Sequence, residues 1–149
     1  MIDSETSALI EEIEQAFAER AHPGDDRIVA FGEDQCSEDS RLGRFLKATS
    51  WQDFDYHSLV ATYGIDPSAF LYLLEPDAFA YYMPAFLIQA LDLDAAPDLA
   101  ESLHFALAPT TEADGEQVAR WKRDHLAPFN ARERRVIDKV YRFLDERLD

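Results

Sequence analysis

Apolar residues recur at helical spacing from the first turns of the chain onward. The apolar positions of the first segment form one stripe: Leu9, Ile13, Ala16 and Phe17. Glutamates fill the positions between them, so the pattern predicts an amphipathic helix that either Ser4 or Ser7 is suited to cap. The Pro-Gly pair of His22-Pro23-Gly24 is expected to end this helix, because proline lacks the amide donor that a helix needs.

Residues 23–40 are the least regular stretch. Ile28-Val29-Ala30-Phe31 is the one β-like run of the chain, and it is too short and isolated to imply a sheet. We expect an extended loop that places Ile28 and Phe31 in the core. A helix from about Ser37 to Lys47 follows, and its expected inner face consists of Leu42, Phe45 and Leu46.

Capping residues, proline and glycine predict the limits of the next two helices. Ser50-Trp51-Gln52-Asp53 resembles a capping box and is expected to begin a short helix, which Gly64 would end. Asp66 and Pro67 then have the order of an N-cap and a first helical residue. The core positions expected in this second helix are Phe70, Leu71, Leu73 and Leu74.

The segment from Asp77 to about Leu91 is the most apolar of the chain, and Pro76 is placed to begin it. Apolar residues cover every side of this helix: Phe79, Tyr81, Tyr82, Met83, Phe86, Leu87, Ile88 and Leu91. A helix that is apolar all round must lie in the centre of a globular domain. Pro84 removes a backbone donor and crowds the carbonyl of Ala80, which predicts a kink or a break there.

The last third of the chain continues the helical pattern. Pro97 is expected to begin a helix that closes at Pro109, and residues 110–116 are polar enough for a loop. A further helix or turn is indicated by Val118, Trp121, Leu126 and Phe129. Asn130 followed by Glu133 predicts a capping box for the last helix. The inner stripe of that helix is expected to be Val136 or Ile137, Val140, Leu144 and Leu148.

These elements predict an all-α fold: one compact domain over residues 1–149, with six to eight orthogonal helices around a central helix kinked at Pro84. A chain of 149 residues buries roughly two-thirds of its unfolded surface, so it needs neither a disulfide nor a metal for stability. Cys36 is the single cysteine, which is typical of a reducing compartment. The start of the chain lacks a signal-peptide pattern and no apolar run approaches ~20 residues, so we expect a cytoplasmic protein.

The net charge is −16, from 30 acidic and 14 basic residues. Such a charge repels phosphate groups, which disfavours nucleic acids and anionic membranes as partners and favours a basic protein. The acidic residues are unevenly distributed along the chain: residues 1–40 contain 12 acidic and 2 basic residues, whereas residues 112–149 contain nine of each. Clustered acid accelerates encounter with a basic partner. The alternative is that the charge serves solubility alone.

Catalytic and metal-binding motifs are weak, and we expect neither an enzyme nor a cofactor. Glu101 and His104 form one Glu-x-x-His pair, whereas a carboxylate-bridged di-iron site needs two such pairs, so an exposed Glu beside a partly buried His is favoured. The acidic pairs Asp25-Asp26 and Glu33-Asp34 lack the ligand spacing of a calcium loop. Cys36 has no basic neighbour that would activate its thiol.

Several sequence blocks occur in a distinctive order. They are Pro23 to Val29, Cys36 to Asp39, Phe45 with Trp51, Glu75 to Leu87, and Phe129 to Leu144. In this order the chain resembles a bacterial family of small uncharacterised proteins over about residues 8–144. The resemblance implies an α-helical domain and brings no established activity with it. Glu75 departs from the pattern, which usually has a Thr N-cap at that position.

The favoured hypothesis is a protein-binding inhibitor, similar to an immunity protein, that covers the active cleft of a basic toxin or effector domain. The residues expected to contact that partner are Asp25, Asp26, Glu33, Asp34, Glu38 and Asp39. Trp51 or Tyr56 would be an aromatic anchor, although the alternative that Trp51 is a core residue is favoured. The second hypothesis is a non-catalytic structural or regulatory adaptor. The third is an enzyme with a pocket beside Pro84 that contains Tyr81, Tyr82 and His104.

Overall fold

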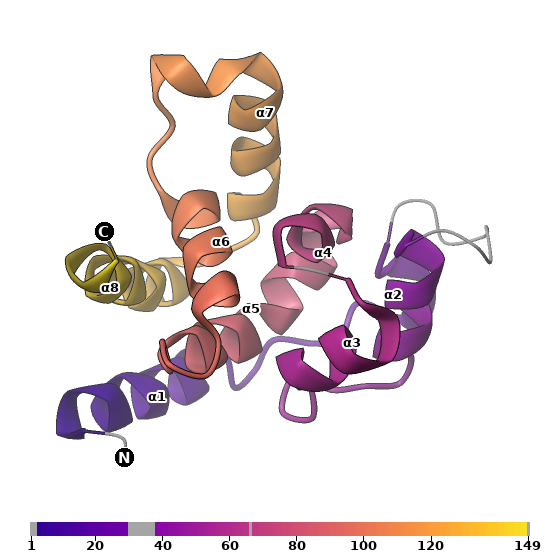
Figure 1. Cartoon of the computed structure of the whole chain (residues 1–149), viewed down its shortest axis with the longest axis horizontal. Helices are drawn as coiled ribbons and strands as arrows, with labels where there is room; N and C mark the ends of the chain where they lie inside the picture. The colour runs from indigo at the N-terminus through magenta and orange to yellow at the C-terminus, as the bar shows by residue number, and fades with distance from the viewer. Residues whose placement is uncertain (1–2, 30–37, 66, 149) are drawn as a thin grey trace.

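The computed structural model describes residues 3–29, 38–65 and 67–148. Within these ranges the chain forms eight α-helices and no strand, which confirms the all-α prediction (Figure 1). The helices are α1 (Ser4–Ala16), α2 (Glu38–Leu46), α3 (Tyr56–Tyr63), α4 (Pro67–Leu73), α5 (Pro76–Ala90), α6 (Pro97–Leu107), α7 (Gly115–Leu126) and α8 (Ala131–Arg147). The orthogonal arrangement of these helices stays a prediction.

α1 begins one capping residue earlier than the sequence suggests. The carboxylate of Asp3 accepts a hydrogen bond from the backbone N–H of Thr6 at 2.8 Å, so Asp3 is the N-cap and not Ser4 or Ser7. The predicted stripe is correct, since Leu9, Ile13 and Phe17 are buried. α1 ends at Ala16, ahead of the Pro-Gly pair.

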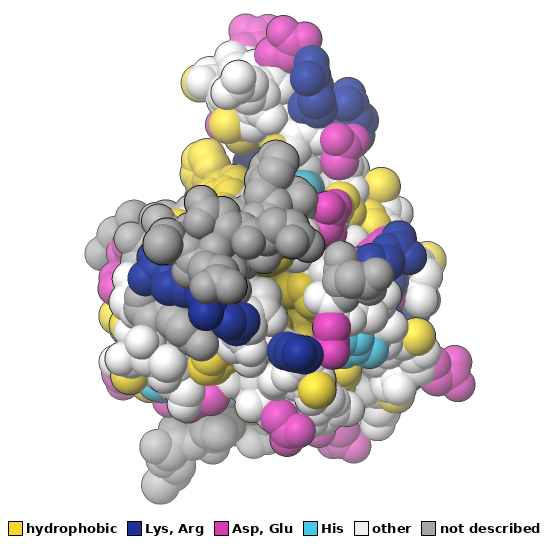
Figure 2. Space-filling view, turned by 90° about the vertical axis from the view of Figure 1, so that its right-hand side faces the viewer, with side chains coloured by type: hydrophobic (Ala, Val, Ile, Leu, Met, Phe, Trp, Pro, Cys, Tyr) yellow, Lys and Arg dark blue, Asp and Glu magenta, His cyan; other side chains and the backbone are white. Residues whose placement is uncertain are grey.

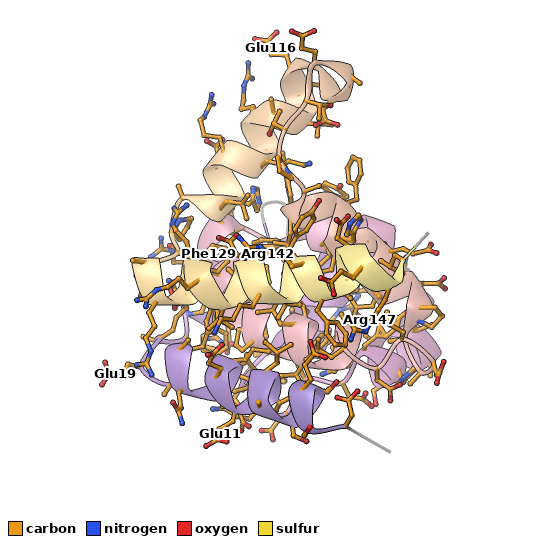
Figure 3. All side chains as sticks on the ribbon, turned by 90° about the vertical axis from the view of Figure 1, so that its left-hand side faces the viewer. Glu11, Glu19, Glu116, Phe129, Arg142 and Arg147 are labelled. Carbon is orange, nitrogen blue, oxygen red and sulfur yellow. The ribbon has the colours of Figure 1, made fainter. Side chains whose placement is uncertain are left out.

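α8 lies antiparallel to α1, and the two helices run side by side (Figure 3). The predicted capping box is present: Asn130 accepts from the N–H of Glu133, and the Glu133 carboxylate accepts from the N–H of Asn130. Val140 and Leu144 are fully buried at the predicted inner positions. The pairing of α1 and α8 therefore follows from two matching apolar stripes.

α5 is buried on nearly all sides and packs against α1, α6 and α7. It begins at Pro76 as predicted, and the side chain of the preceding Glu75 makes no capping hydrogen bond. The helix is continuous through Pro84 and is not broken there. A kink at Pro84 stays a prediction.

The segment before α3 corrects a second predicted cap. The Ser50 hydroxyl donates to Asp53 in a turn that is not helical, and α3 begins at Tyr56 with Asp55 as its N-cap. Gly64 ends α3 in the left-handed conformation, with φ of 65° and its N–H donating to the carbonyl of Val60, as predicted. α4 begins at Pro67, also as predicted, while Asp66 lies outside the described residues.

Three more predictions concern loops. Ile28 is fully buried, and Val29 forms an isolated bridge with Leu74, whereas Phe31 lies outside the described residues. α6 begins at Pro97 as predicted, and the loop after it contains a short 3-10 helix, Glu112–Asp114. The segment with Val118 and Trp121 is helical and forms α7. None of the helices in the described ranges is long and apolar enough to cross a membrane.

Candidate functional site

Of the six acidic residues predicted to contact a partner, Asp25 is the one whose side chain the structure describes. It is exposed, and its Oδ1 accepts a hydrogen bond from the backbone N–H of Ala48 at 2.8 Å. This bond ties the loop after α1 to the end of α2. The other five side chains lie outside the described part of the chain: Asp26, Glu33, Asp34, Glu38 and Asp39.

The two candidate aromatic anchors belong to the core. Trp51 and Tyr56 have only 7% and 6% of their surface exposed. The backbone N–H of Trp51 donates to the phenol oxygen of Tyr81, and the backbone N–H of Tyr56 donates to the side chain of Gln89. Neither aromatic ring is available to a partner, so the alternative reading of Trp51 as a core residue is confirmed and the expectation of Tyr56 as an anchor is wrong.

The three residues of the enzyme hypothesis lie in two different places. The phenol of Tyr82 donates to the carbonyl of Thr49 at 2.6 Å, and burial, followed by the nearby Tyr81 and Asp25, raises its pKa. His104 instead contacts α8, where its Nε2 lies 2.9 Å from Asp145 and its ring stacks on Tyr141. Tyr81 lines a small cavity beside His22, and neither Tyr82 nor His104 lines that cavity.

The Glu-x-x-His pair, Glu101 and His104, has the arrangement predicted from the sequence, an exposed Glu beside a partly buried His. Glu101 is exposed and His104 is half-buried. Among the residues with described positions, no group of three or more His, Cys, Asp or Glu side chains is arranged to hold a metal ion.

Part of the acid in α1 is neutralised by α8. Glu5 pairs with Arg147 at 3.2 Å, and Glu12 pairs with Lys139 at 2.7 Å. Charge on another face is mixed as well, since Figure 2 shows Lys and Arg side chains exposed beside Asp and Glu side chains. Two acidic residues of α1 are therefore paired with α8, and the acidic binding surface expected in the first quarter of the chain stays a prediction.

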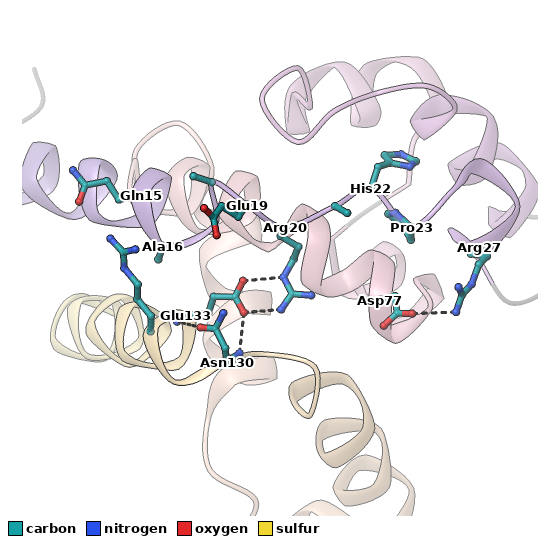
Figure 4. A pocket seen from close by; sticks show the side chains of 13 residues that line it. Gln15, Ala16, Glu19, Arg20, His22, Pro23, Arg27, Asp77, Asn130 and Glu133 are labelled. Atoms are coloured by element: carbon teal, nitrogen blue, oxygen red, sulfur yellow. Dashed lines mark hydrogen bonds and ion pairs between the residues drawn. The ribbon is translucent and has the colours of Figure 1, made fainter.

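A polar cleft of about 990 Å³ lies where the end of α1, the loop after it, and the first turns of α5 and α8 meet (Figure 4). Arg20 forms two hydrogen bonds to the Glu133 carboxylate, at 2.6 and 2.8 Å, and a third to the carbonyl of Pro128. Arg27 pairs with Asp77 at 3.1 Å across the same cleft. Because these charges compensate one another, the cleft is primarily a junction that holds α1 and α8 together.

A second concavity, which we call the acidic groove, has a different balance of charge. It is about 590 Å³ in volume and lies between the starts of α1, α3 and α6 and the ends of α5 and α8. Its rim carries four exposed carboxylates: Asp3, Asp55, Asp92 and Asp94. Its floor includes three half-buried aliphatic side chains: Ile10, Ile88 and Leu93.

Local hydrogen bonds hold three of the four rim carboxylates in place. Asp3 accepts from the N–H of Thr6, Asp55 from the N–H of His57 at 3.3 Å, and Asp92 from the N–H of Ala95 at 3.2 Å. The hydrogen bond from the Thr6 N–H is the main cause that lowers the pKa of Asp3, so Asp3 is ionised at neutral pH.

Gln89 fixes the position of the segment that carries Asp55. Its side-chain oxygen accepts from the N–H of Tyr56 at 2.7 Å, and its amide group donates to the carbonyl of Phe54 at 2.7 Å. The two bonds join α5 to both sides of Asp55 in the chain. The backbone that carries this carboxylate is therefore attached to the most buried helix of the domain.

The rim carboxylates of the acidic groove have no internal counterion. None of the four forms an ion pair with a Lys or Arg in the described ranges. Arg147 is the one Lys or Arg among the residues that line the groove, and it lies at the end of α8 (Figure 3). Its guanidinium pairs with Glu5 of α1. The groove therefore combines four carboxylates with the one Arg147 guanidinium, an excess of negative charge above an apolar floor.

The sequence contains a signal for this groove that the charge balance of the first 40 residues obscures. No Lys or Arg occurs between Lys47 and Arg120, although acidic residues continue through this stretch. Asp55, Asp92 and Asp94 all come from it, so basic neighbours in the chain are absent. That these three residues lie near Asp3 follows only from the packing of α1 on α5.

Comparisons with protein families, with curated proteins and with solved structures find no match to this chain. The resemblance of its sequence blocks to a family of small bacterial proteins accordingly stays a prediction.

Proposed function

We propose that this protein is a non-catalytic binding protein that recognises a basic protein, in the manner of an immunity protein that covers the active cleft of a toxin or effector domain. The observation that carries the proposal is the acidic groove, whose four rim carboxylates form no close ion pair with a Lys or Arg of the described chain. Uncompensated carboxylates favour a cationic surface on the partner and repel phosphate groups.

The net charge of the whole chain supports the same function. A charge of −16 on 149 residues attracts basic proteins at long range and raises their association rate. An inhibitor gains from such an increase because it must reach its target before the target acts. The polar cleft supports this function less, because two of its arginines, Arg20 and Arg27, are already paired with carboxylates.

The test is to co-express the tagged chain with each protein encoded beside its gene and to purify it at low ionic strength. At about 0.01–0.1 M salt the Debye length is about 10–30 Å, so charge-driven complexes are retained. The proposal predicts that a basic partner is retained, that high salt releases it, and that the chain suppresses the partner's toxicity or enzymatic activity.

Two results would separate the alternatives. A basic partner that is retained but keeps its full activity would favour the adaptor hypothesis over the inhibitor. If no protein encoded beside the gene is retained, or if the retained protein is acidic, recognition of a basic protein by this chain is wrong.

A further inference from the structure

The shape and charge of the acidic groove suit the binding of an extended peptide segment. We infer that it binds a segment of the partner in which Arg or Lys side chains alternate with apolar side chains. This inference rests on the proposed function and names the surface and the chemistry by which it would operate.

The floor provides an apolar surface beside the charge. Ile10, Ile88 and Leu93 come from α1, α5 and the loop after α5, and each is half-buried against the core. An Arg or Lys side chain can lay its aliphatic stem along such a surface while its charged head reaches a carboxylate. An apolar neighbour in the same segment would cover the remainder of the floor.

The rim provides acceptors that are held in place before a ligand arrives. Asp92 uses Oδ1 for a backbone hydrogen bond, and Asp3 accepts hydrogen bonds from both the backbone and the side chain of Thr6. Asp94, in the same loop as Asp92, is exposed. Carboxylates fixed in this way lose little side-chain entropy when a guanidinium or ammonium group binds.

Arg147 shows the chemistry that this end of the molecule accommodates. Its guanidinium lies over the Phe143 ring and pairs with Glu5, so an aromatic floor and a carboxylate already hold one cation here. Arg147 forms its close ion pairs with Glu5 and Glu146 and with none of the four rim carboxylates. Its charge acts on Asp3 at longer range, after the hydrogen bonds from Thr6, as a lesser cause of the lowered pKa of that carboxyl. The volume of about 590 Å³ lies within the roughly 300–1,000 Å³ of typical ligand sites and suits a few side chains.

The experiment uses the purified full chain and a short synthetic peptide in which Arg and Leu alternate. Binding is measured by titration calorimetry at about 0.1 M salt, where the Debye length is about 10 Å. A peptide with Ser in place of Leu tests the apolar floor, and a peptide with Glu in place of Arg tests the charge. We expect the Arg-Leu peptide to bind about tenfold more tightly than the Arg-Ser peptide, a difference of about 1.4 kcal/mol.

The groove variant carries Asp3→Asn, Asp55→Asn, Asp92→Asn and Asp94→Asn. Asparagine caps helices nearly as well as aspartate, so the fold is retained while four charges are removed. A matched control removes four charges elsewhere, at exposed positions that do not line the groove: Glu14→Gln, Glu101→Gln, Glu112→Gln and Asp138→Asn. We expect the groove variant to weaken peptide binding at least tenfold and the control less than threefold.

A smaller variant, Asp92→Asn with Asp94→Asn, changes the loop alone and serves if the fourfold variant unfolds. The inference is overturned if groove and control variants weaken binding equally, if the Arg-Ser peptide binds as tightly as the Arg-Leu peptide, or if wild type binds neither. A natural partner that the groove variant retains with unchanged affinity would also overturn it, while leaving the proposed function intact.

Discussion

The guanidinium of Arg147 lies over the ring of Phe143, with its central carbon 3.6 Å from the ring centroid. The same group donates to the carbonyl of Phe143, one turn earlier on α8, and to the carboxylate of Glu5 on α1. These contacts hold the Arg147 guanidinium against Phe143 and Glu5, at one side of the acidic groove. The carboxylates of Asp92 and Asp94, on the loop after α5, are therefore left to a partner.

Replacing Arg147 with Met should have opposite effects on stability and on binding. The unfolding free energy should fall by about 1–2 kcal/mol, because an exposed ion pair contributes about 0.2–1 kcal/mol and a cation–π contact about 0.5–1 kcal/mol. Affinity for the Arg-Leu peptide should rise, since the change removes a positive charge from the groove. Denaturant unfolding and peptide titration measure the two effects. A loss of both stability and affinity would contradict the assignment of the groove.

Gln89 should be a structural requirement of the segment around Asp55. Gln89→Leu leaves the N–H of Tyr56 and the carbonyl of Phe54 without their partner, at about 1–3 kcal/mol for each group that stays buried. We expect a loss of about 2 kcal/mol and faster amide exchange at Tyr56. Gln117→Leu, at an exposed position on α7, is the control and should change stability by less than about 0.5 kcal/mol.

The ion pair between Arg20 and Glu133 should be the strongest single polar link between α1 and α8. Glu133 is 2% exposed, and Gln at this position keeps the capping box while removing the charge. With 20% of the Arg20 side chain exposed, we expect Glu133→Gln to lower the unfolding free energy by about 2–3 kcal/mol. Chemical denaturation measures this loss.

A double-mutant cycle with Arg20→Met separates the pair from its surroundings. The double variant should be less destabilised than the sum of the two single variants, by about 1–3 kcal/mol, because neither charge is then left unpaired. Strict additivity would show that Arg20 and Glu133 act independently of each other.

The helices were predictable where the chain offers one strong signal. Pro67 and Pro97 begin helices and Gly64 ends one, because the fixed φ of proline and the free φ of glycine leave few alternatives. At the start of α1, by contrast, Asp3, Ser4 and Ser7 are all good caps. Sequence alone does not rank them, and the described structure uses Asp3.

Ser50 shows why another predicted cap is wrong. The backbone beside it bonds to side chains of α5 instead of forming a helix: Trp51 donates to Tyr81, and Phe54 accepts from Gln89. Such hydrogen bonds join residues that are about 30 positions apart, so no local pattern predicts them. The acidic groove was missed for the same reason, because its rim combines Asp3, Asp55 and Asp92 from separate elements.

Two glycines should respond oppositely to the same substitution. Gly64 has φ of 65°, where a β-carbon is strained, so Gly64→Ala should lower the unfolding free energy by about 1 kcal/mol. Gly43 lies inside α2, and a β-carbon there would meet Val29 at an ordinary contact distance of 3.4 Å. Gly43→Ala should therefore raise stability by about 0.4–1 kcal/mol. Thermal unfolding of both variants checks the pair, and equal signs would contradict the backbone assignment.

Asp3 should give the chain an identifiable acid sensitivity. Hydrogen bonding by the Thr6 N–H is the largest of the causes that lower its pKa in the folded state below the ordinary value of 3.8. A carboxyl whose pKa is lower in the folded state stabilises the fold at pH values above its unfolded pKa, and this stabilisation is lost as the pH falls through the folded pKa. Asp3→Asn keeps the capping oxygen but does not titrate. The stability difference between wild type and Asp3→Asn should therefore be constant above about pH 5 and should shift against wild type as the pH falls below ~4. Urea unfolding of both proteins across this pH range measures the difference, and a difference independent of pH would show that the Asp3 carboxylate does not act as the charged cap of α1.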